Sequence, residues 1–146
     1  MKDENCIFCK LAAHEIDTKV VYEDDYVLAF DDMEPLMPVH TLIIPKDHYA
    51  NIGDNVPEEI LGKVMAAVPK VAKIKGLTNG YRLMVNTGED ASQSVQHWHV
   101  HLLGGGWMPR PNDQDWGPNA TNAKELDRGS STRRRFPRGR SRPWDP

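Results

Sequence analysis

The stretch QHWHVHLLGG, residues 96–105, carries three of the chain's six histidines, at every second position. Such alternation is the pattern of a β-strand, because successive side chains point to opposite faces of a sheet. It predicts a strand that places His97, His99 and His101 together on a solvated face and the apolar residues between them toward a core. Imidazoles do little to pack a solvated face, so three in a row indicate chemistry. A metal-binding ladder or a chance run is the alternative.

The length and charge of the chain indicate one domain with a basic tail. Its 146 residues are 39% apolar, and no apolar run approaches the roughly 18 residues that a membrane span requires. The polar residues 1–5 predict no signal peptide, hence a cytoplasmic protein. Residues 1–127 carry 11 Lys and Arg against 20 Asp and Glu, whereas residues 128–146 carry seven Arg and one Asp. The acidic body argues against nucleic acid as a partner.

The remaining segments predict an α+β domain at residues 1–117. Strand-like runs occupy residues 19–23, 26–30, 40–45 and 81–86, and the first two form a hairpin. Apolar residues recur at helical spacing from residue 60 to 76, after a helix start capped by Asn55, and Pro69 should kink this helix. With a short N-terminal helix, the prediction is a five-stranded antiparallel sheet and one long helix. Residues 118–146 are predicted to be a disordered Arg-rich tail, either a functional arm or an extension foreign to the domain.

The two cysteines, Cys6 and Cys9, have a spacing that suits a metal site or a redox pair. In a zinc site both thiolates reach one ion, and distant residues complete a tetrahedron. A redox pair follows a strand in a thioredoxin-like unit, and no strand is predicted before Cys6, which disfavours that interpretation. Two thiols without a ligand remain a third possibility.

Four segments together resemble the histidine-triad (HIT) superfamily. These are the histidine strand itself, CIFCKL at 6–11, AFDDMEPLMPVHTLIIPKDH at 29–48, and VNTGEDASQSV at 85–95. A third histidine at position 101 resembles the nucleoside phosphoramidase branch, since dinucleoside polyphosphate hydrolases usually have Gln there. The resemblance implies a sheet continued across a homodimer, a purine nucleotide pocket, and hydrolysis at the α-phosphorus. A dinucleoside polyphosphate hydrolase, or a nucleotide-binding module with vestigial activity, is the alternative.

The resemblance also implies residue roles. The catalytic residues it implies are the nucleophile His99, the phosphoryl-binding His101 and His40, and Ser94 at the leaving group. The nucleotide-binding residues it implies are Asp32 at the ribose hydroxyls, with Asp31 as the neighbouring register, and Asn86, Gln93, His99 and His101 around the phosphate. No catalytic metal is expected.

A structural zinc site is implied as well, tying the N-terminus to the sheet. Its four ligands would be Cys6, Cys9, His48 and His97. An ordinary exposed loop histidine is the alternative for His48. Two positions depart from the family pattern. Ser92 replaces a usual Gly, so a backbone that suits only Gly would be strained there, and Gly106 stands where Arg commonly follows the two glycines.

Overall fold

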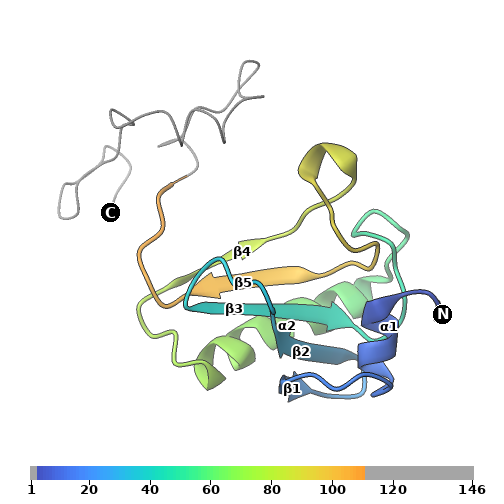
Figure 1. The fold of residues 1–146 in the computed structure, drawn as a ribbon, viewed down its shortest axis with the longest axis horizontal. Helices are drawn as coiled ribbons and strands as arrows, with labels where there is room; N and C mark the ends of the chain where they lie inside the picture. Colours follow the sequence, from blue (N-terminus) through green and yellow to red (C-terminus); the bar gives the residue numbers. More distant parts are fainter. Residues whose placement is uncertain (1–2, 111–146) are drawn as a thin grey trace. The chain divides into compact units, whose positions relative to one another are not determined.

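The computed structural model describes residues 3–110. In chain order the elements are α1 (Ile7–Ala12), β1 (Val20–Glu23), β2 (Val27–Asp31), β3 (Val39–Pro45), α2 (Glu58–Ile74), β4 (Tyr81–Met84), the 3-10 helix η1 (Glu89–Ala91) and β5 (Val100–Gly104) (Figure 1). This confirms the predicted α+β class. The compact unit that holds these elements is Met1–Gly106. The predicted domain end at residue 117 and the predicted tail lie outside the described residues and stay predictions.

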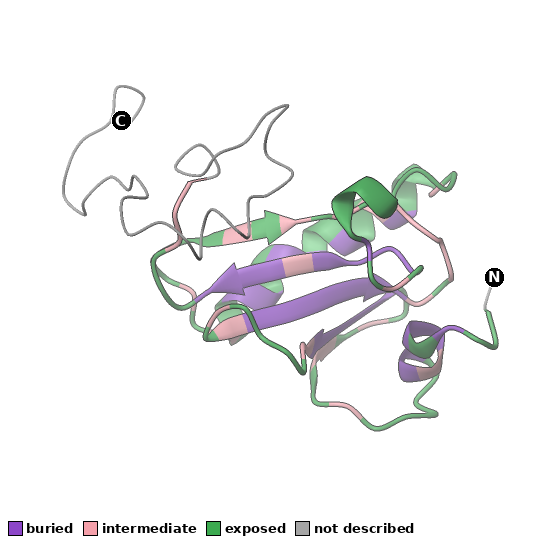
Figure 2. Cartoon of the chain, turned by 45° about the horizontal axis from the view of Figure 1, so that its top comes forward, coloured by how far each residue is buried: buried purple, intermediate pink, exposed green. Residues whose placement is uncertain are grey.

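The five strands form one antiparallel sheet in the order β1-β2-β3-β5-β4. The histidine strand β5 therefore lies between β3 and β4, and its His101 pairs with Leu42 of β3. Figure 2 shows that β3 and β5 are almost wholly buried, whereas the edge strand β4 is largely exposed. The sheet thus brings the histidine strand beside the segment that carries His40.

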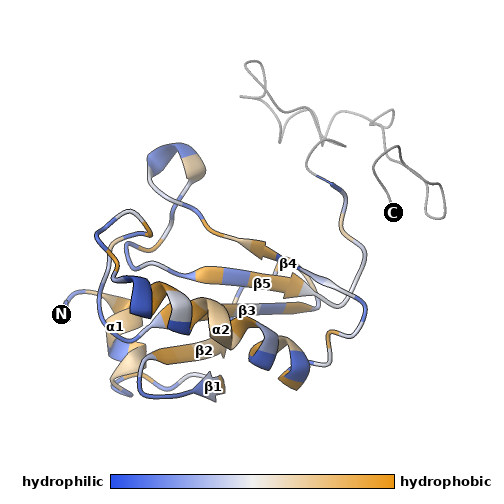
Figure 3. Cartoon of the chain, turned by 180° about the vertical axis from the view of Figure 1, so that it is seen from behind, coloured by the Kyte–Doolittle hydropathy of each residue, from blue (hydrophilic) through white to orange (hydrophobic). Residues whose placement is uncertain are grey.

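Each face of the sheet has its own hydrophobic core, because neighbouring side chains of a strand point to opposite faces. On one face the sheet residues pack against α2, whose buried positions are all apolar and whose exposed positions mix charged residues with apolar ones such as Met65 and Ile74 (Figure 3). This core includes Val27, Ile43, Trp98, Val100 and Leu102 from the sheet side. On the other face, α1 packs on Leu28, Phe30, Leu42 and Ile44. Both faces are therefore covered where β2 and β3 lie.

The long helix was predicted correctly in extent but not in its cap. The N-cap of α2 is Pro57, with no side-chain hydrogen bond, and Asn55 has a left-handed φ of 51° before it. The prediction that Asn55 caps the helix is therefore wrong. α2 continues past Pro69, which lies on its exposed side. No helix in the described part of the chain is long and apolar enough to cross a membrane.

The histidine segment differs from its prediction in two respects. Regular strand geometry begins only at Val100, so His97 and His99 precede β5. The alternation nevertheless persists, with Trp98 in the α2 core and the imidazoles on the opposite face. α1 covers two of the three imidazoles on that face: His97 is 0% and His99 4% exposed, whereas His101 is half-buried. The prediction of a solvated face is therefore wrong for His97 and His99.

Candidate active site

His99 is held with one ring nitrogen bonded and the other carrying a lone pair. Its Nδ1 lies 2.7 Å from the carbonyl oxygen of His97. A carbonyl only accepts hydrogen bonds, so Nδ1 carries the proton and Nε2 keeps a free electron pair. The ring is buried, and Phe8 of α1 contacts it edge-on with ring centroids 5.2 Å apart. His99 thus has the tautomer of a nitrogen nucleophile.

The neighbouring His40 and His101 form a directed hydrogen-bond chain. The backbone N–H of Leu36 donates to His40 Nδ1 over 3.0 Å, so the proton of a neutral His40 sits on Nε2. His40 Nε2 in turn lies 2.8 Å from His101 Nδ1 and donates to it. The proton of His101 is therefore on its Nε2, a buried atom with no hydrogen-bond partner among the described residues. One N–H donor is left for a ligand.

The imidazoles of His40 and His101 are both kept neutral. Burial lowers the pKa of His101 to about 4, assisted by the nearby His99 and His40 and opposed by Asp32. Burial also lowers the pKa of His40, with Asp32 again opposing. At neutral pH the directed chain of donors and acceptors is therefore intact, and His101 acts as a neutral donor.

The two neighbouring aspartates face different sides of the sheet. Asp31 pairs in register with Thr41, accepts a hydrogen bond from its hydroxyl, and forms a two-oxygen ion pair with Lys75 at 2.9 and 3.0 Å. Asp32 lies on the histidine side, with Oδ2 3.5 Å from His40 Nε2. The carboxylate close to the histidines is thus Asp32, the residue predicted for the ribose, and Asp31 is engaged in holding the end of α2.

The loop before the histidines is fixed by Gln93. Its amide nitrogen donates to the carbonyls of Ala50 and Val95 at 2.7 and 3.0 Å, and its oxygen accepts from the N–H of Gly88 at 2.9 Å. The buried side chain therefore holds the loop that carries Ser94, which is exposed, and Asn86, which is half-buried. The predicted contact of Gln93 with a phosphate stays a prediction.

Ser92 occupies the backbone conformation that the resemblance led us to expect for Gly. Its φ and ψ are 56° and 42°, in the left-handed region, where it ends η1. A side chain costs energy there because Cβ approaches the carbonyl oxygen. The expected strain at this position is therefore present in the loop leading to Ser94.

The predicted metal ligands come together beneath α1. The ligand atoms of Cys6, Cys9, His48 and His97 all lie within 4.8 Å of one another. His97 Nδ1 is 3.2 Å from Cys6 Sγ and 3.5 Å from Cys9 Sγ, and His48 Nδ1 is 3.4 Å from Cys9 Sγ. Zinc–sulfur and zinc–nitrogen bonds of about 2.3 and 2.0 Å at a tetrahedral angle separate S and N by about 3.5 Å.

The orientation of His97 fits a metal ligand too. Its Nε2 donates to the carbonyl of Pro45 over 2.8 Å, which leaves the Nδ1 lone pair facing the two sulfurs. Such an outer hydrogen bond is the usual partner of a metal-bound imidazole. The chemistry and spacing of these four residues therefore fit a closed structural zinc site.

A second group of possible ligands, Asp32, His40 and His101, fits a metal poorly. The nitrogens of His40 and His101 that face each other are joined by one proton. To bind an ion, His40 would have to move that proton to Nδ1, against the N–H of Leu36. His40 and His101 therefore form a hydrogen-bond chain and not a metal site.

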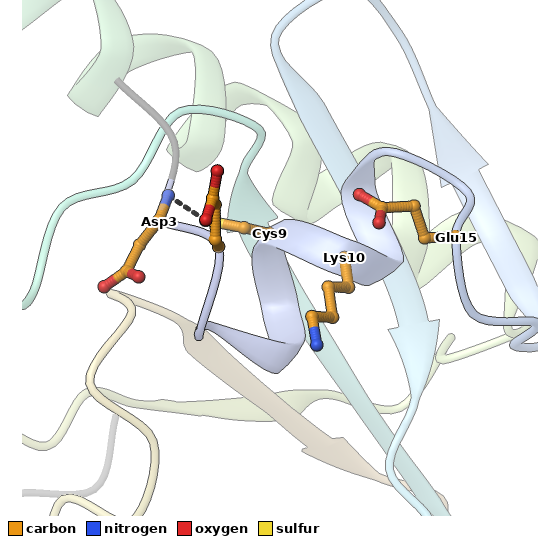
Figure 4. Close-up of a pocket in the computed structure, with 5 residues that line it drawn as sticks. Asp3, Cys9, Lys10 and Glu15 are labelled. Carbon is orange, nitrogen blue, oxygen red and sulfur yellow. Dashed lines mark hydrogen bonds between the residues drawn. The ribbon is translucent and has the colours of Figure 1, made fainter.

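A cavity of about 370 Å³ lies beside the cysteine cluster (Figure 4). It is lined by Asp3, Glu4, Cys9, Lys10 and Glu15, and the backbone N–H of Asp3 lies 3.5 Å from Cys9 Sγ. The lining includes one residue of the metal cluster and none of the predicted nucleotide residues. The cavity therefore belongs to the N-terminal segment and not to the histidine site.

Comparison with known proteins covers most of the chain. The HIT domain family matches residues 13–107. The chain belongs to the HIT family. One relative of this HIT protein is the "Adenylylsulfatase HINT1" of Arabidopsis thaliana, 45% identical over 75% of this chain and 77% of the relative. Another is the "14 kDa zinc-binding protein" of Zea mays, 46% identical over 76% of this chain and 90% of the relative.

Solved structures give the same result for the fold. The "HIT family hydrolase" of Clostridium thermocellum is 44% identical, has a TM-score of 0.71, and matches 75% of this chain and 97% of its own. The predicted membership of the HIT superfamily and the five-stranded α+β fold are thereby confirmed. The continuation of the sheet across a dimer stays a prediction.

Two parts of this HIT protein's site were not predicted from the sequence. One is Phe8, which touches the rings of His97 and His99. Its only signal was an aromatic residue inside the C-x-x-C motif. The other is the N–H of Leu36, which sets the tautomer of His40. A backbone donor in an irregular loop leaves no trace in the side-chain pattern.

Proposed function

We propose that this protein is a nucleotide hydrolase that cleaves the P–N bond of purine nucleoside 5′-phosphoramidates. The observation that carries the proposal is the pairing of two tautomers: a lone pair on His99 Nε2 and an unpartnered N–H on His101 Nε2, with ring centroids 4.9 Å apart. One nitrogen can attack a phosphorus while the other donates to its oxygens. Membership of the HIT family supports the same reaction class.

The reaction proceeds in two steps through a covalent intermediate. His99 Nε2 donates its lone pair to the α-phosphorus, the P–N bond breaks, and the amine leaves with a proton that the Ser94 hydroxyl passes on from solvent. The imidazole becomes cationic, and its Nδ1–H bond to the His97 carbonyl stabilises that charge. Water then attacks the phosphorus and gives up a proton to solvent, the P–Nε2 bond breaks with its electron pair returning to His99, and the nucleoside monophosphate departs. His101 donates to the phosphoryl oxygens in both steps.

Binding of the nucleotide is assigned to the neighbouring polar residues. The carboxylate of Asp32 has two oxygens that suit a vicinal ribose diol, and its exposed fraction of 22% leaves it accessible. Asn86 flanks the phosphate in this proposal, and Gln93, whose amide hydrogens are bonded to Ala50 and Val95, holds the loop beside it. Zinc, held by Cys6, Cys9, His48 and His97, cross-links the N-terminal segment to the sheet and takes no part in the chemistry. The name of the Zea mays relative supports this assignment.

A homodimer is proposed with the sheet continued between protomers. Support comes from the edge strand β4, where Tyr81 and Leu83 are 41% and 37% exposed. An edge strand with apolar side chains and free backbone groups is suited to pairing with another chain. The mass of the protein in solution, with Leu83→Lys as the disrupting variant, tests this assignment. The predicted cytoplasmic location stays a prediction.

The reaction class is tested with an adenosine 5′-phosphoramidate of tryptamine, comparing wild type with His99→Ala and His14→Ala. Turnover in the wild type and the His14 variant, its loss in the His99 variant, and an AMP-sized adduct trapped by rapid quench are expected. Adenylyl sulfate is the second substrate, because the name of the Arabidopsis relative describes an adenylylsulfatase. Turnover of diadenosine polyphosphates alone would favour that class of hydrolase, and AMP binding without turnover would favour a binding module.

A further inference from the structure

His97 takes part in two sites at once. Its side chain points Nδ1 at the sulfurs of Cys6 and Cys9, while its backbone carbonyl accepts the hydrogen bond from His99 Nδ1. The metal cluster and the candidate nucleophile are therefore joined through the atoms of a single residue. A change in the direction of the His97 carbonyl must change the bond that sets the tautomer of His99.

The backbone around His97 is held from outside the strand ladder of the sheet. β5 begins only at Val100, so the peptide groups from His97 to His99 are outside the strand pairings of the sheet. The N–H of Trp98, which belongs to the same planar peptide group as the His97 carbonyl, donates to the carbonyl of Tyr49 over 2.6 Å. The side chain of His97 supplies further anchors, to Pro45 on one side and to the cysteines on the other. The direction of the His97 carbonyl is thus set jointly by the Trp98–Tyr49 bond and by the side-chain anchors of His97, and the cysteines of the metal cluster supply one side of those anchors.

Phe8 gives a second connection between the same two sites. It lies between Cys6 and Cys9, and its ring contacts His97 and His99 at centroid distances of 5.9 and 5.2 Å. α1 has only six residues, and so short a helix is not stable on its own. Its place over the histidines depends on tertiary contacts, which include those of its two cysteines.

We propose that the Cys6–Cys9–His48–His97 cluster is a positioning device for His99. With metal bound, His97 is fixed, its carbonyl holds His99 in the tautomer with a free Nε2 lone pair, and α1 keeps Phe8 against the ring. Without metal, His97 loses its anchor to the cysteines and α1 loses its tie to the sheet, so His99 samples other rotamers and tautomers. The metal ligands and Phe8 are therefore positioning residues. The kinetic consequence rests on the proposed function, whereas the consequence for the His99 ring does not.

The test measures the ring nitrogens of His99 by NMR in protein carrying ¹⁵N-labelled histidine. The samples are zinc-loaded wild type, chelator-treated wild type, Cys9→Ser, and Cys9→His, which keeps a zinc ligand. Metal content is measured by mass spectrometry and folding by circular dichroism. We expect well-separated protonated and unprotonated nitrogen shifts for His99 in the zinc-loaded protein and in Cys9→His. In the metal-free samples the two shifts should move toward each other.

Kinetics provide the second readout. Loss of metal should lower kcat on the phosphoramidate about 10- to 100-fold, since a small misplacement of a reacting group has effects of that size. The dissociation constant for AMP should change less than about threefold, because ligands of the metal do not touch the nucleotide in the proposed site. Cys9→His should restore both zinc content and kcat.

Phe8→Leu keeps all four metal ligands and covers the case in which metal-free protein unfolds. This variant should bind zinc and fold. The two ring-nitrogen shifts of His99 should move toward each other, and kcat should fall. Unchanged His99 shifts in folded metal-free protein, or in Phe8→Leu if the metal-free protein unfolds, would overturn the inference. A protein that fails to hydrolyse any phosphoramidate would refute the proposed function but leave the ring-nitrogen result decisive.

Discussion

His40 and His101 share one proton: His40 Nε2 lies 2.8 Å from His101 Nδ1. The direction of this bond is set four residues before His40, where the N–H of Leu36 occupies His40 Nδ1. The two imidazoles therefore act as one unit that presents a single N–H, on His101 Nε2. Substituting either residue should therefore affect this one N–H donor.

Replacing His40 by Phe removes the donor to His101 while keeping an aromatic ring. His101 can then place its proton on either nitrogen, so the donor to the phosphoryl oxygens is present only part of the time. We expect kcat on an adenosine phosphoramidate to fall about 10- to 100-fold, somewhat less than for loss of a fixed oxyanion donor. His14→Phe is the control, because His14 pairs with Glu23 outside the site. Equal rates for the two variants would contradict the role given to His40.

Substitution of Asp31 should lower the stability of the protein, whereas substitution of Asp32 should weaken nucleotide binding. Asp31→Asn breaks the half-buried ion pair with Lys75 and should lower the free energy of unfolding by about 1–2 kcal/mol. Asp32→Asn should weaken AMP binding about tenfold, because an amide is a poorer acceptor for two hydroxyls. Urea denaturation and calorimetric titration on both variants measure the contrast. A stronger effect of Asp31→Asn on AMP binding would reverse the assignment.

Acid should destabilise the protein through His101. Its pKa is about 4 in the folded state and about 6.5 in the unfolded chain. Between these values the unfolded state binds more protons, so the contribution of His101 is complete above about pH 6.5 and is lost as the pH falls toward 4. The loss amounts to at most about 3 kcal/mol.

Urea denaturation from pH 7.5 to 4.5 measures this effect, with His101→Gln as the reference. Carboxylates titrate in both proteins, whereas only the wild type contains His101. The wild type should therefore lose more stability than the variant between pH 6.5 and 4.5. Parallel pH profiles would show that His101 is not shielded from protons.

Ser92→Gly should stabilise the protein. Ser92 has a φ of 56°, where a residue with Cβ costs about 1–2 kcal/mol relative to Gly, partly offset by the greater freedom of Gly in the unfolded chain. We expect a net gain of about 0.5–1 kcal/mol in the free energy of unfolding. Ser94→Gly, in the same loop but without a positive φ, is the matched control and should lose stability. Stabilisation by both variants would indicate an effect of the loop as a whole.

Several features followed from the sequence alone because they are local. Alternation along residues 96–103 placed Trp98, Val100 and Leu102 on one side of the chain and the histidines on the other, as observed. The helical spacing of α2 and the hairpin of β1 and β2 also depend only on neighbours in the chain. Asn55 shows the limit: it has capping chemistry, but it adopts a left-handed backbone conformation two residues before the actual cap, Pro57.

Tertiary structure alone decided what each imidazole can do. The identity of a histidine does not fix which nitrogen carries the proton; that depends on partners as distant in sequence as His40 and His101 or Pro45 and His97. Nor could local pattern show that α1 buries the histidine face, because the contacts of Phe8 with His97 and His99 join segments about ninety residues apart. The sequence determined which chemical groups lie on one face. Only the packing of α1, β3 and β5 determined their protonation and direction, because hydrogen bonds select a tautomer through positions in space.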